Sequence, residues 1–211
     1  MIAVSLFDYT GNMLKPWHDA GYTCYAVDLQ HDGKTDDGIN RVNYDLSLPW
    51  LPTFSPDDIT IVFAFPPCDH LAVSGARWFK GKGLRKLADS INLFATAAEF
   101  CEWSKAPYMI ENPVSTISSY WRKPDCTFNP ADYTGFCRAD NYTKKTCLWL
   151  GNDFVMPEQN KIDCGAPDDR IHKMPPGKDR KNKRSATPMG FAQAVFESNR
   201  QPGTCERMAA T

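Results

Sequence analysis

The sequence predicts a single-domain α/β protein with a doubly wound, mostly parallel sheet. Short apolar runs alternate with segments of helical period, which is the pattern of strands joined by crossover helices. The chain has 211 residues, a common size for one domain. In such sheets ligands bind beyond the carboxyl ends of the strands. The side chains expected at those ends are Asp8, Asp28, Asp45, Cys68 and Glu111.

The first elements are short. Residues 2–7 (IAVSLF) form an apolar run that stops at a polar loop, which predicts a strand. Residues 13–21 fit a short helix that Pro16 begins or breaks. Residues 22–29 (YTCYAVDL) are rich in β-branched and aromatic side chains, which favours a second strand.

The middle of the chain carries the clearest elements. Residues 41–47 fit a shorter strand, whereas 59–65 (ITIVFAF) form a continuous apolar run, as a strand buried on both faces does. Apolar side chains then recur at spacings of three and four over residues 84–104, which predicts a long amphipathic helix. Two further strands are expected at 107–110 and 146–150.

The last third differs in character from the core at 1–151. Residues 170–184 hold seven Lys or Arg and one acidic residue with no apolar period, so 152–184 is expected to be a basic loop region. Residues 187–199 predict a closing helix with Thr187 as N-cap and Pro188 at N1, within a segment 185–211 that folds back on the core. The tail after Pro202 is expected to fray, and residues 121–136 read as an aromatic-rich loop.

Composition limits the functional classes. The net charge is −1, so any nucleic-acid contact must come from a local basic patch. No apolar run approaches the roughly 18 residues of a membrane span, and no signal peptide is evident, so we expect a cytoplasmic protein. The spacing of Cys126, Cys137, Cys147 and Cys164 lacks C-x-x-C pairs, so free or buried thiols are expected in place of a metal site.

Three blocks carry a family resemblance. In order and spacing, FDYTGNMLKPWHDAGY (7–22), FPPCDHLAVSG (65–75) and IENP (110–113) resemble the cytosine carbon-5 DNA methyltransferases. The resemblance implies a Rossmann-like methyltransferase fold and S-adenosylmethionine as cofactor. Tyr9 stands where the family has its first glycine, and Asp69 and Ala72 stand where glutamine and serine are common.

The resemblance implies a set of cofactor contacts. Asp28 would accept hydrogen bonds from both ribose hydroxyls, as a carboxylate can, and Asp45 would accept one from the adenine amino group. Each aspartate alone would more often be a solvated loop residue; the argument rests on their successive placement at strand ends. The implied cofactor residues are Phe7, Asp8, Tyr9, Thr10, Gly11, Asp28, Leu29, Asp45, Leu46 and Pro66.

The same resemblance implies covalent chemistry. Carbon-5 of cytosine becomes nucleophilic when a thiolate adds at carbon-6, and an acid at N3 stabilises the charge on the ring. Cys68 would be the nucleophile and Glu111 the N3 partner, with Asn112 and Lys144 completing the catalytic set. The two prolines before Cys68 would turn the chain out of the sheet, and a helix beginning after it would lower the thiol pKa.

The substrate is the open part of the prediction. YTKKTCLWLG (142–151) resembles the family block Q-x-R-x-R in part, with Lys144 and Thr146 in the arginine places, and Ser185 and Thr187 fall in a C-terminal cofactor block. About thirty residues stand in place of a target-recognition domain, too few for a separate core. The implied substrate contacts are Pro67, Ser74, Arg77, Lys144 and Lys145.

Three functions therefore remain open. The first is methylation of cytosine in DNA with little sequence specificity, by a monomer that resembles compact bacteriophage forms of the family. The second is methylation of a free cytosine nucleotide such as the monophosphate. The third is a non-catalytic protein that binds DNA or the cofactor.

Overall fold

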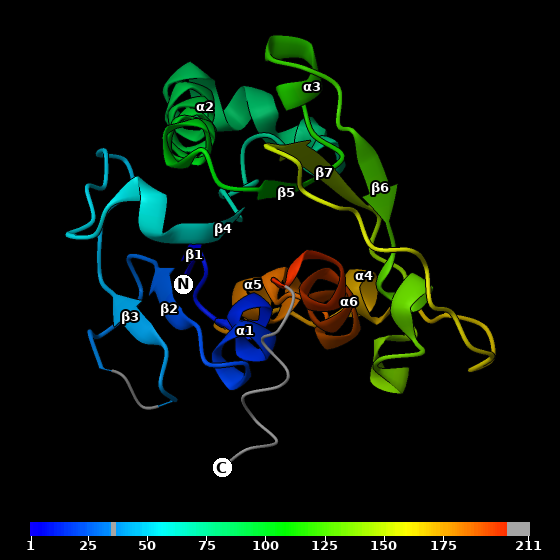
Figure 1. Ribbon diagram of the computed structural model, residues 1–211. Coiled ribbons are helices and arrows are strands. Elements are labelled where there is room, and N and C mark those ends of the chain that lie inside the picture. Colours follow the sequence, from blue (N-terminus) through cyan, green and yellow to red (C-terminus); the bar gives the residue numbers. More distant parts are fainter. Residues whose placement is uncertain (35–36, 202–211) are drawn as a thin grey trace.

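A seven-stranded sheet forms the centre of the protein. The computed structural model describes residues 1–34 and 37–201, and its strand order is β3-β2-β1-β4-β5-β7-β6 (Figure 1). The strands β1 to β5 are parallel, and β7 runs antiparallel to both β5 and β6. The predicted α/β class with a mostly parallel sheet is confirmed. The strands are β1 (Ile2–Leu6), β2 (Thr23–Val27), β3 (Asn40–Val42), β4 (Ile59–Ala64), β5 (Tyr108–Pro113), β6 (Cys126–Phe128) and β7 (Thr146–Gly151).

Helices cover both faces of the sheet. On one face lie η1 (Asn12–Leu14), α1 (Lys15–Asp19) and α6 (Met189–Asn199), and on the other lies α2 (Phe79–Ser104) (Figure 1). Shorter turns connect these layers: η2 (Pro56–Asp58), η3 (Val73–Trp78), α3 (Ile117–Tyr120), η4 (Pro130–Tyr133), η5 (Arg138–Asp140), α4 (Arg170–Lys173) and α5 (Arg180–Ser185).

Strand β4 explains why its sequence is continuously apolar. It lies between β1 and β5, so both of its faces are covered. Ile61 and Phe63 pack with α1 and α6, whereas Val62 and Ala64 pack with α2. Trp17 of α1 lies 5.9 Å from Phe63 between ring centroids, which joins the helix layer to the strand. The central strand thereby holds both layers in place.

Several predicted boundaries need correction. The strand predicted at 41–47 is only Asn40–Val42, and the helix predicted from Leu84 begins at Phe79 and bends at Gly83, whose φ is 81°. The aromatic-rich segment 121–136, expected to be a loop, contains β6 and η4. A strand of three residues is too short to show an apolar alternation in the sequence. Its position is set by the neighbouring strand with which it pairs.

The basic region was also misjudged. Residues 170–184, predicted to be a loop, contain α4 and α5, two helices of four and six residues. Helix α6 begins at Met189 with Pro188 as N-cap and no side-chain cap bond, so Thr187 is not the cap. Helix α6 packs against α1 and η1 in the core, as a C-terminal helix folding back should. The predicted fraying after Pro202 lies outside the described residues.

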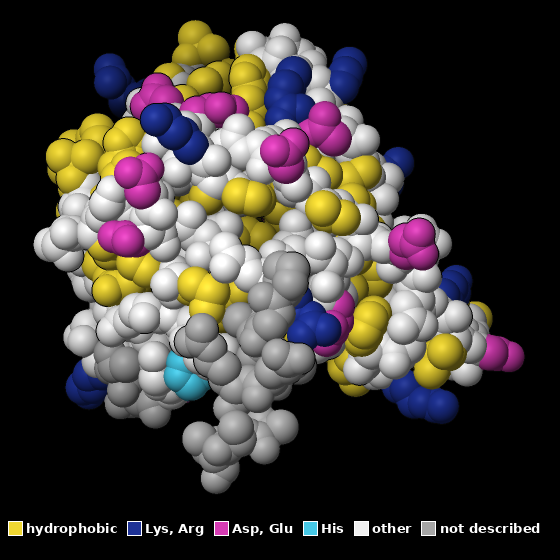
Figure 2. Space-filling model, viewed as in Figure 1, with side chains coloured by type: hydrophobic (Ala, Val, Ile, Leu, Met, Phe, Trp, Pro, Cys, Tyr) yellow, Lys and Arg dark blue, Asp and Glu magenta, His cyan; other side chains and the backbone are white. Residues whose placement is uncertain are grey.

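The edge at which the parallel strands begin carries mixed charge. Figure 2 views the molecule from that edge, and acidic and basic side chains are interspersed on it. Within the described chain, no helix is both long and apolar enough to cross a bilayer.

Candidate active site

The carboxyl ends of the parallel strands bring the predicted site residues to one edge. In the order 3-2-1-4-5 the chain reverses direction between β1 and β4, so the loops after these two strands diverge and leave a crevice. The loop after β1 contains Asp8 to Gly11, and the loop after β4 contains Cys68. The sequence therefore places its two most specific blocks on either side of the topological switch point.

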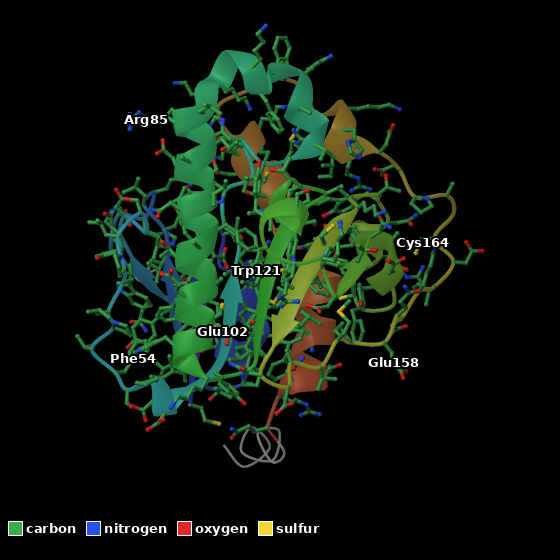
Figure 3. The ribbon with its side chains drawn as sticks, turned by 90° about the horizontal axis from the view of Figure 1, so that it is seen from above. Phe54, Arg85, Glu102, Trp121, Glu158 and Cys164 are labelled. Atoms are coloured by element: carbon green, nitrogen blue, oxygen red, sulfur yellow. The ribbon has the colours of Figure 1, made fainter. Side chains whose placement is uncertain are left out.

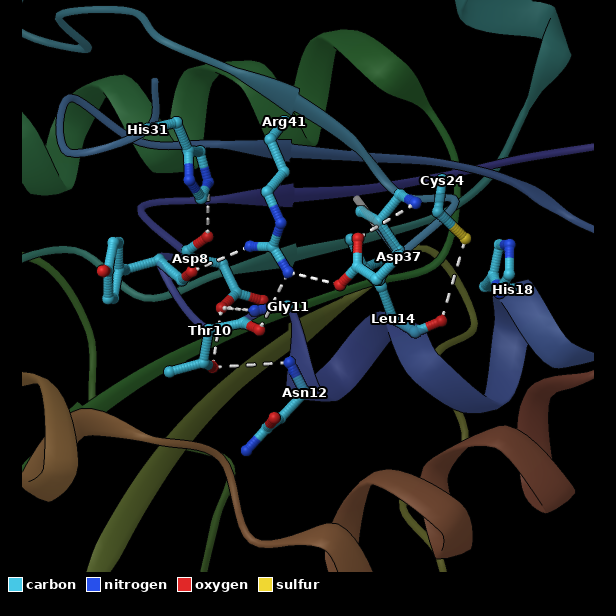
Figure 4. A network of polar contacts seen from close by, with 12 residues as sticks. Asp8, Thr10, Gly11, Asn12, Leu14, His18, Cys24, His31, Asp37 and Arg41 are labelled. Carbon is cyan, nitrogen blue, oxygen red and sulfur yellow. Dashed lines mark hydrogen bonds and ion pairs between the residues drawn. The ribbon is translucent and has the colours of Figure 1, made fainter. Parts of the chain in front are cut away.

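The buried carboxylate of Asp8 organises the loop after β1 (Figure 4). Its Oδ1 accepts hydrogen bonds from the Gly11 amide at 2.8 Å and the Thr10 hydroxyl at 3.1 Å, and its Oδ2 accepts one from the Ser5 hydroxyl at 2.7 Å. Phe7 has a φ of 56°, an uncommon backbone state for a residue with a side chain. The loop is thus held in one sharp turn, and Asp8 acts by shaping it.

Arg41 braces the same loop from strand β3. Its guanidinium donates to the Tyr9 carbonyl at 2.9 Å and pairs with Asp37 at 2.5 Å (Figure 4). Gly11 has a φ of 69°, and a Cβ there would lie 3.2 Å from the Arg41 guanidinium. Only glycine suits that close approach in this backbone state. Tyr9, in the place of the family glycine, stacks on His31 with centroids 5.9 Å apart.

The acidic residues after β2 and β3 lie at the same edge. Asp28 is partly buried, and both hydrogen bonds to its side chain within the described chain come from Gln30 and end on Oδ1, so Oδ2 is available to a ligand. Asp45 is exposed, and the Ser47 amide lowers the pKa of its carboxyl. Leu46 is buried in the core, whereas Leu29 is 61% exposed.

The Cys68 loop leaves the sheet as the two prolines predict. The last ladder bond runs from the Phe65 amide to the Leu6 carbonyl at 3.0 Å, and the Cys68 carbonyl accepts from the amides of Leu71 and Ala72. The buried side-chain amide of Asn112 donates to the Pro66 carbonyl at 2.9 Å. Asn112 therefore fixes the exit of the chain toward Cys68.

A second set of bonds joins the loop after Cys68 to the loop after Glu111. The Val73 amide donates to the Val114 carbonyl, and the Thr116 amide donates to the Leu71 carbonyl. Ala72 and Ser115 form an antiparallel bridge between these donors. The two blocks resembling Pro-Cys and Glu-Asn thus form one unit, because backbone bonds hold their loops together.

Glu111 and Lys144 lie within electrostatic reach of Cys68. Burial raises the pKa of the partly buried Cys68 thiol to about 11; Glu111 and Asp69 add to the rise, whereas Lys144 lowers it. The condition for a lowered thiol pKa, a helix that begins directly after Cys68, is not met. A turn follows Cys68 and η3 begins only at Val73, so no helix N-terminus acts on the thiol.

The predicted substrate residues are distributed around this centre. Pro67 is partly buried beside Cys68, and Ser74 and Arg77 are exposed on η3, with the Arg77 guanidinium 5.0 Å from the Trp78 ring centroid. Lys145 is exposed, and its positive charge lowers the pKa of the Cys147 thiol. Burial raises that pKa by more, so the net shift is upward. Thr146 is buried and donates to the Lys144 carbonyl at 2.9 Å.

Helix α5 crosses over this edge. Lys181 pairs with Asp69 at 2.7 Å, and the Asn182 amide donates to Gln30 at 3.1 Å, so α5 spans from the loop after β4 to the loop after β2. Lys82 of α2 also contacts the Asp69 backbone carbonyl. Ser185 donates to the Asn182 carbonyl within α5. Asn12 donates to the Thr187 carbonyl at 3.1 Å, which ties the first loop to α6.

Sequence reasoning missed several of these residues. Arg41, His31 and Asn12 act through bonds to backbone carbonyls, for which the sequence holds no spacing signal. The Lys181–Asp69 pair joins residues 112 positions apart. The basic segment 170–184 was the only feature of the sequence that pointed to Lys181. That this segment lies next to Asp69 could not be predicted without the fold.

The fold and the site define a class. The protein has a Rossmann-like α/β fold, with Cys68 in the loop after β4 and Glu111 within the neighbouring strand β5, which continues to Pro113 beyond the predicted end at residue 110. The sequence matches no protein-family model, and a comparison with curated proteins gives no significant match. The seven described cysteines are free thiols, and residues 1–34 and 37–201 contain no cluster of three or more His, Cys, Asp or Glu that could hold a metal ion.

Proposed function

We propose that the protein methylates carbon-5 of cytosine, in DNA with little sequence specificity, with Cys68 as the nucleophile. The observation that carries this proposal is the arrangement of Cys68, Glu111 and Lys144. Three groups of complementary chemistry lie close enough to change the thiol pKa, at the strand ends where this fold binds ligands.

The loop after β1 fits S-adenosylmethionine, the implied cofactor. Gly11 has φ 69° and its missing side chain leaves room for Arg41, which fixes the sharp turn of this loop at the carboxyl end of β1, where this fold binds ligands. The free Oδ2 of Asp28 suits a ribose hydroxyl, and the exposed Leu29 offers an apolar surface for the adenine. When bound, S-adenosylmethionine supplies the methyl group.

The raised pKa of Cys68 suggests how its proton is handled. At neutral pH the thiol holds its proton and Glu111 contributes to that by its negative charge. Net transfer of the thiol proton to Glu111, relayed by water, would make the thiolate and neutralise the carboxylate. The protonated Glu111 can then donate to N3 of cytosine while the thiolate adds at carbon-6.

The remaining steps restore the enzyme. Addition of sulfur at carbon-6 makes carbon-5 a nucleophilic enamine carbon, which would accept the methyl group, with S-adenosylhomocysteine as the leaving group. Water then takes the carbon-5 proton, the bond between sulfur and carbon-6 breaks with its electron pair going to Cys68 as thiolate, and N3 returns its proton to Glu111, from which Cys68 is reprotonated. Lys144 stabilises this thiolate, because its ammonium group favours the charged form.

The basic segment 170–184 supports DNA as the substrate. It holds seven Lys or Arg, and Lys181 brings it next to Asp69, the neighbour of Cys68. Phosphate contacts of this kind fix a strand without reading its sequence. A free cytosine nucleotide remains the second candidate substrate, because the same Lys181 could hold its phosphate.

The test is transfer of a labelled methyl group to DNA and, in parallel, to cytidine monophosphate. We expect transfer to DNA that Cys68→Ser abolishes. The matched control is Cys164→Ser, which changes another partly exposed free thiol. Transfer to cytidine monophosphate but not to DNA would make the free nucleotide the substrate. Transfer to neither acceptor, with the cofactor bound, would contradict the proposal.

A further inference from the structure

A second pocket lies beside the Cys68 loop, where α2 bends. It has a volume of about 350 Å³, which is in the range of small-ligand sites. We call it the kink pocket; its lining residues are His70, Phe79, Lys80, Lys82, Gly83, Leu84 and Leu87. The chemistry proposed above uses none of them.

The bend in α2 makes this pocket. Gly83 has φ 81° and ψ 163°, values outside the helical region, so the segment before it departs from the axis of the long helix. In Figure 3, α2 runs straight from Glu102 toward Arg85 and then turns sharply. Phe79 and Lys82 come from one side of the bend and Leu84 and Leu87 from the other, which is why a hollow forms between them.

The pocket opens next to the nucleophile. His70 follows Cys68 by two residues, a span of at most ~7 Å along the chain. Lys82 contacts the Asp69 carbonyl, which ties the bent segment to the same loop. The pocket and Cys68 are thus tied to the same short loop, through His70 in its lining and through the contact of Lys82 with Asp69.

The lining suits a nucleobase attached to a phosphate. The partly buried Phe79, His70 and Leu87 and the exposed Leu84 give an apolar and aromatic lining, and Lys80 and Lys82 add positive charge. Residues 77–86 contain five Lys or Arg and no acidic residue; with the basic segment they hold half of the chain's 24 Lys and Arg. Bases that leave a stack are held in proteins by aromatic side chains of this kind.

We propose that the kink pocket holds the base next to the target cytosine in a polynucleotide strand. This inference rests on the proposed function, since cytosine at Cys68 defines which base is the neighbour. It would give a chain with about thirty residues in place of a target-recognition domain a limited means of sensing sequence context. A free nucleotide has no neighbouring base and would not use the pocket.

The test is a binding cycle with the full-length protein. Single-stranded DNA of ten nucleotides with one cytosine, labelled with fluorescein, is compared with two versions that carry an abasic site directly 5′ or 3′ of the cytosine. Anisotropy at one fixed salt concentration gives the Kd for wild type, Phe79→Ala and Leu84→Ser. Leu84 is 84% exposed, so Leu84→Ser should not affect folding. It therefore tests the pocket even if Phe79→Ala destabilises the protein.

The expected result is a coupling between pocket and base. Phe79→Ala should weaken binding of the intact strand about tenfold, as loss of one stacking contact does. It should have no effect on one of the abasic strands. Phe136→Ala, which changes a 41% exposed phenylalanine outside this pocket, should leave all three values unchanged. Equal effects of the pocket variants on the intact and both abasic strands would overturn the inference.

This outcome is separable from the proposed function. Binding is measured without the cofactor, so the coupling decides the pocket even if no methyl transfer occurs. Where transfer to cytidine monophosphate is measurable, Phe79→Ala should leave its rate unchanged. A matching loss on the free nucleotide would also overturn the assignment, because the variant would then be acting on Cys68 itself.

Discussion

The side-chain amide of Asn112 donates a hydrogen bond to the main-chain carbonyl of Pro66 across 2.9 Å. This bond links the ends of two adjacent strands, β4 and β5. Pro66 stands two residues before Cys68, the proposed nucleophile, and Asn112 directly follows Glu111, its proposed partner. Both groups are buried, so the bond is shielded from water. It makes the position of Cys68 dependent on the strand that carries Glu111.

Asn112→Ala removes the donor and leaves the Pro66 carbonyl buried without it. We expect a loss of about 1–3 kcal/mol in the free energy of unfolding. We also expect methyl transfer to fall further than stability explains. The matched control is Asn199→Ala, whose side-chain amide donates to the carbonyls of Val155 and Val195 at 2.8 and 2.9 Å, away from the site.

Denaturant unfolding and transfer rates at a temperature where both variants are folded separate the two effects. Equal loss of activity in Asn112→Ala and Asn199→Ala would mean that the Pro66 bond has no role in positioning Cys68.

The reactivity of Cys68 toward a small alkylating reagent should follow its pKa. Because burial, Glu111 and Asp69 raise this pKa to about 11, the alkylation rate should climb through pH 9 and 10 without levelling. Glu111→Gln should lower the midpoint, and Lys144→Gln should raise it. Mass spectrometry of the Cys68 peptide gives each rate. A plateau below pH 9 in the wild type would contradict this electrostatic account.

The loop after β1 should control cofactor affinity through Gly11. Gly11→Ala places a side chain at φ 69°, which strains the backbone, and crowds the Arg41 guanidinium that braces the loop. Gly33→Ala is the control, since Gly33 has φ 78° but nothing within 4 Å of its Cβ position. Calorimetry with S-adenosylmethionine should show weaker binding, by tenfold or more, for Gly11→Ala alone. Equal affinities would remove this loop from the cofactor site.

Asp140 predicts a pH dependence of stability. Its carboxyl accepts from the Gly190 amide at 2.7 Å at the start of α6, and burial raises its pKa above 3.8. A raised carboxyl pKa means that the folded state favours the neutral form, so stability is lost as pH rises through the folded pKa.

Asp140→Asn keeps an acceptor for Gly190 and removes the charge. We expect the variant to be more stable than wild type at pH 7, with the difference vanishing below the unfolded pKa of 3.8. Thermal unfolding across this range provides the measurement. A variant less stable than wild type at neutral pH would show that the charge of Asp140 stabilises the fold.

The sequence predicted the elements whose pattern is local. Strands β1, β2, β4, β5 and β7 and helix α2 follow from apolar runs or a period of three and four, because burial of one face or both requires those side chains. Strand β6, with three residues, exists because β7 pairs with it. Helices α4 and α5 are short and rich in basic residues, and Ile171 is their only buried residue, so they carry no apolar stripe and their pattern resembled a loop.

The site was predictable to the same extent. Residues at strand ends could be placed at one edge from topology alone, which brought Asp28, Cys68 and Glu111 together. The raised thiol pKa was not predictable, because its largest cause is burial, and burial depends on which segments pack around Cys68. The contact of Lys181 with Asp69 depends on how α5 returns across the sheet, which no spacing in the sequence encodes.

The central claim is a covalent bond between Cys68 and carbon-6 of cytosine. DNA containing 5-fluorocytosine tests it directly, because the fluorine cannot be removed as a proton and the adduct cannot break down. With S-adenosylmethionine present, intact-mass spectrometry should show protein joined to the methylated oligonucleotide, with the bond mapped to Cys68 and lost in Cys68→Ser. Absence of any adduct under conditions where DNA and cofactor both bind, or an adduct that survives Cys68→Ser, would contradict the claim.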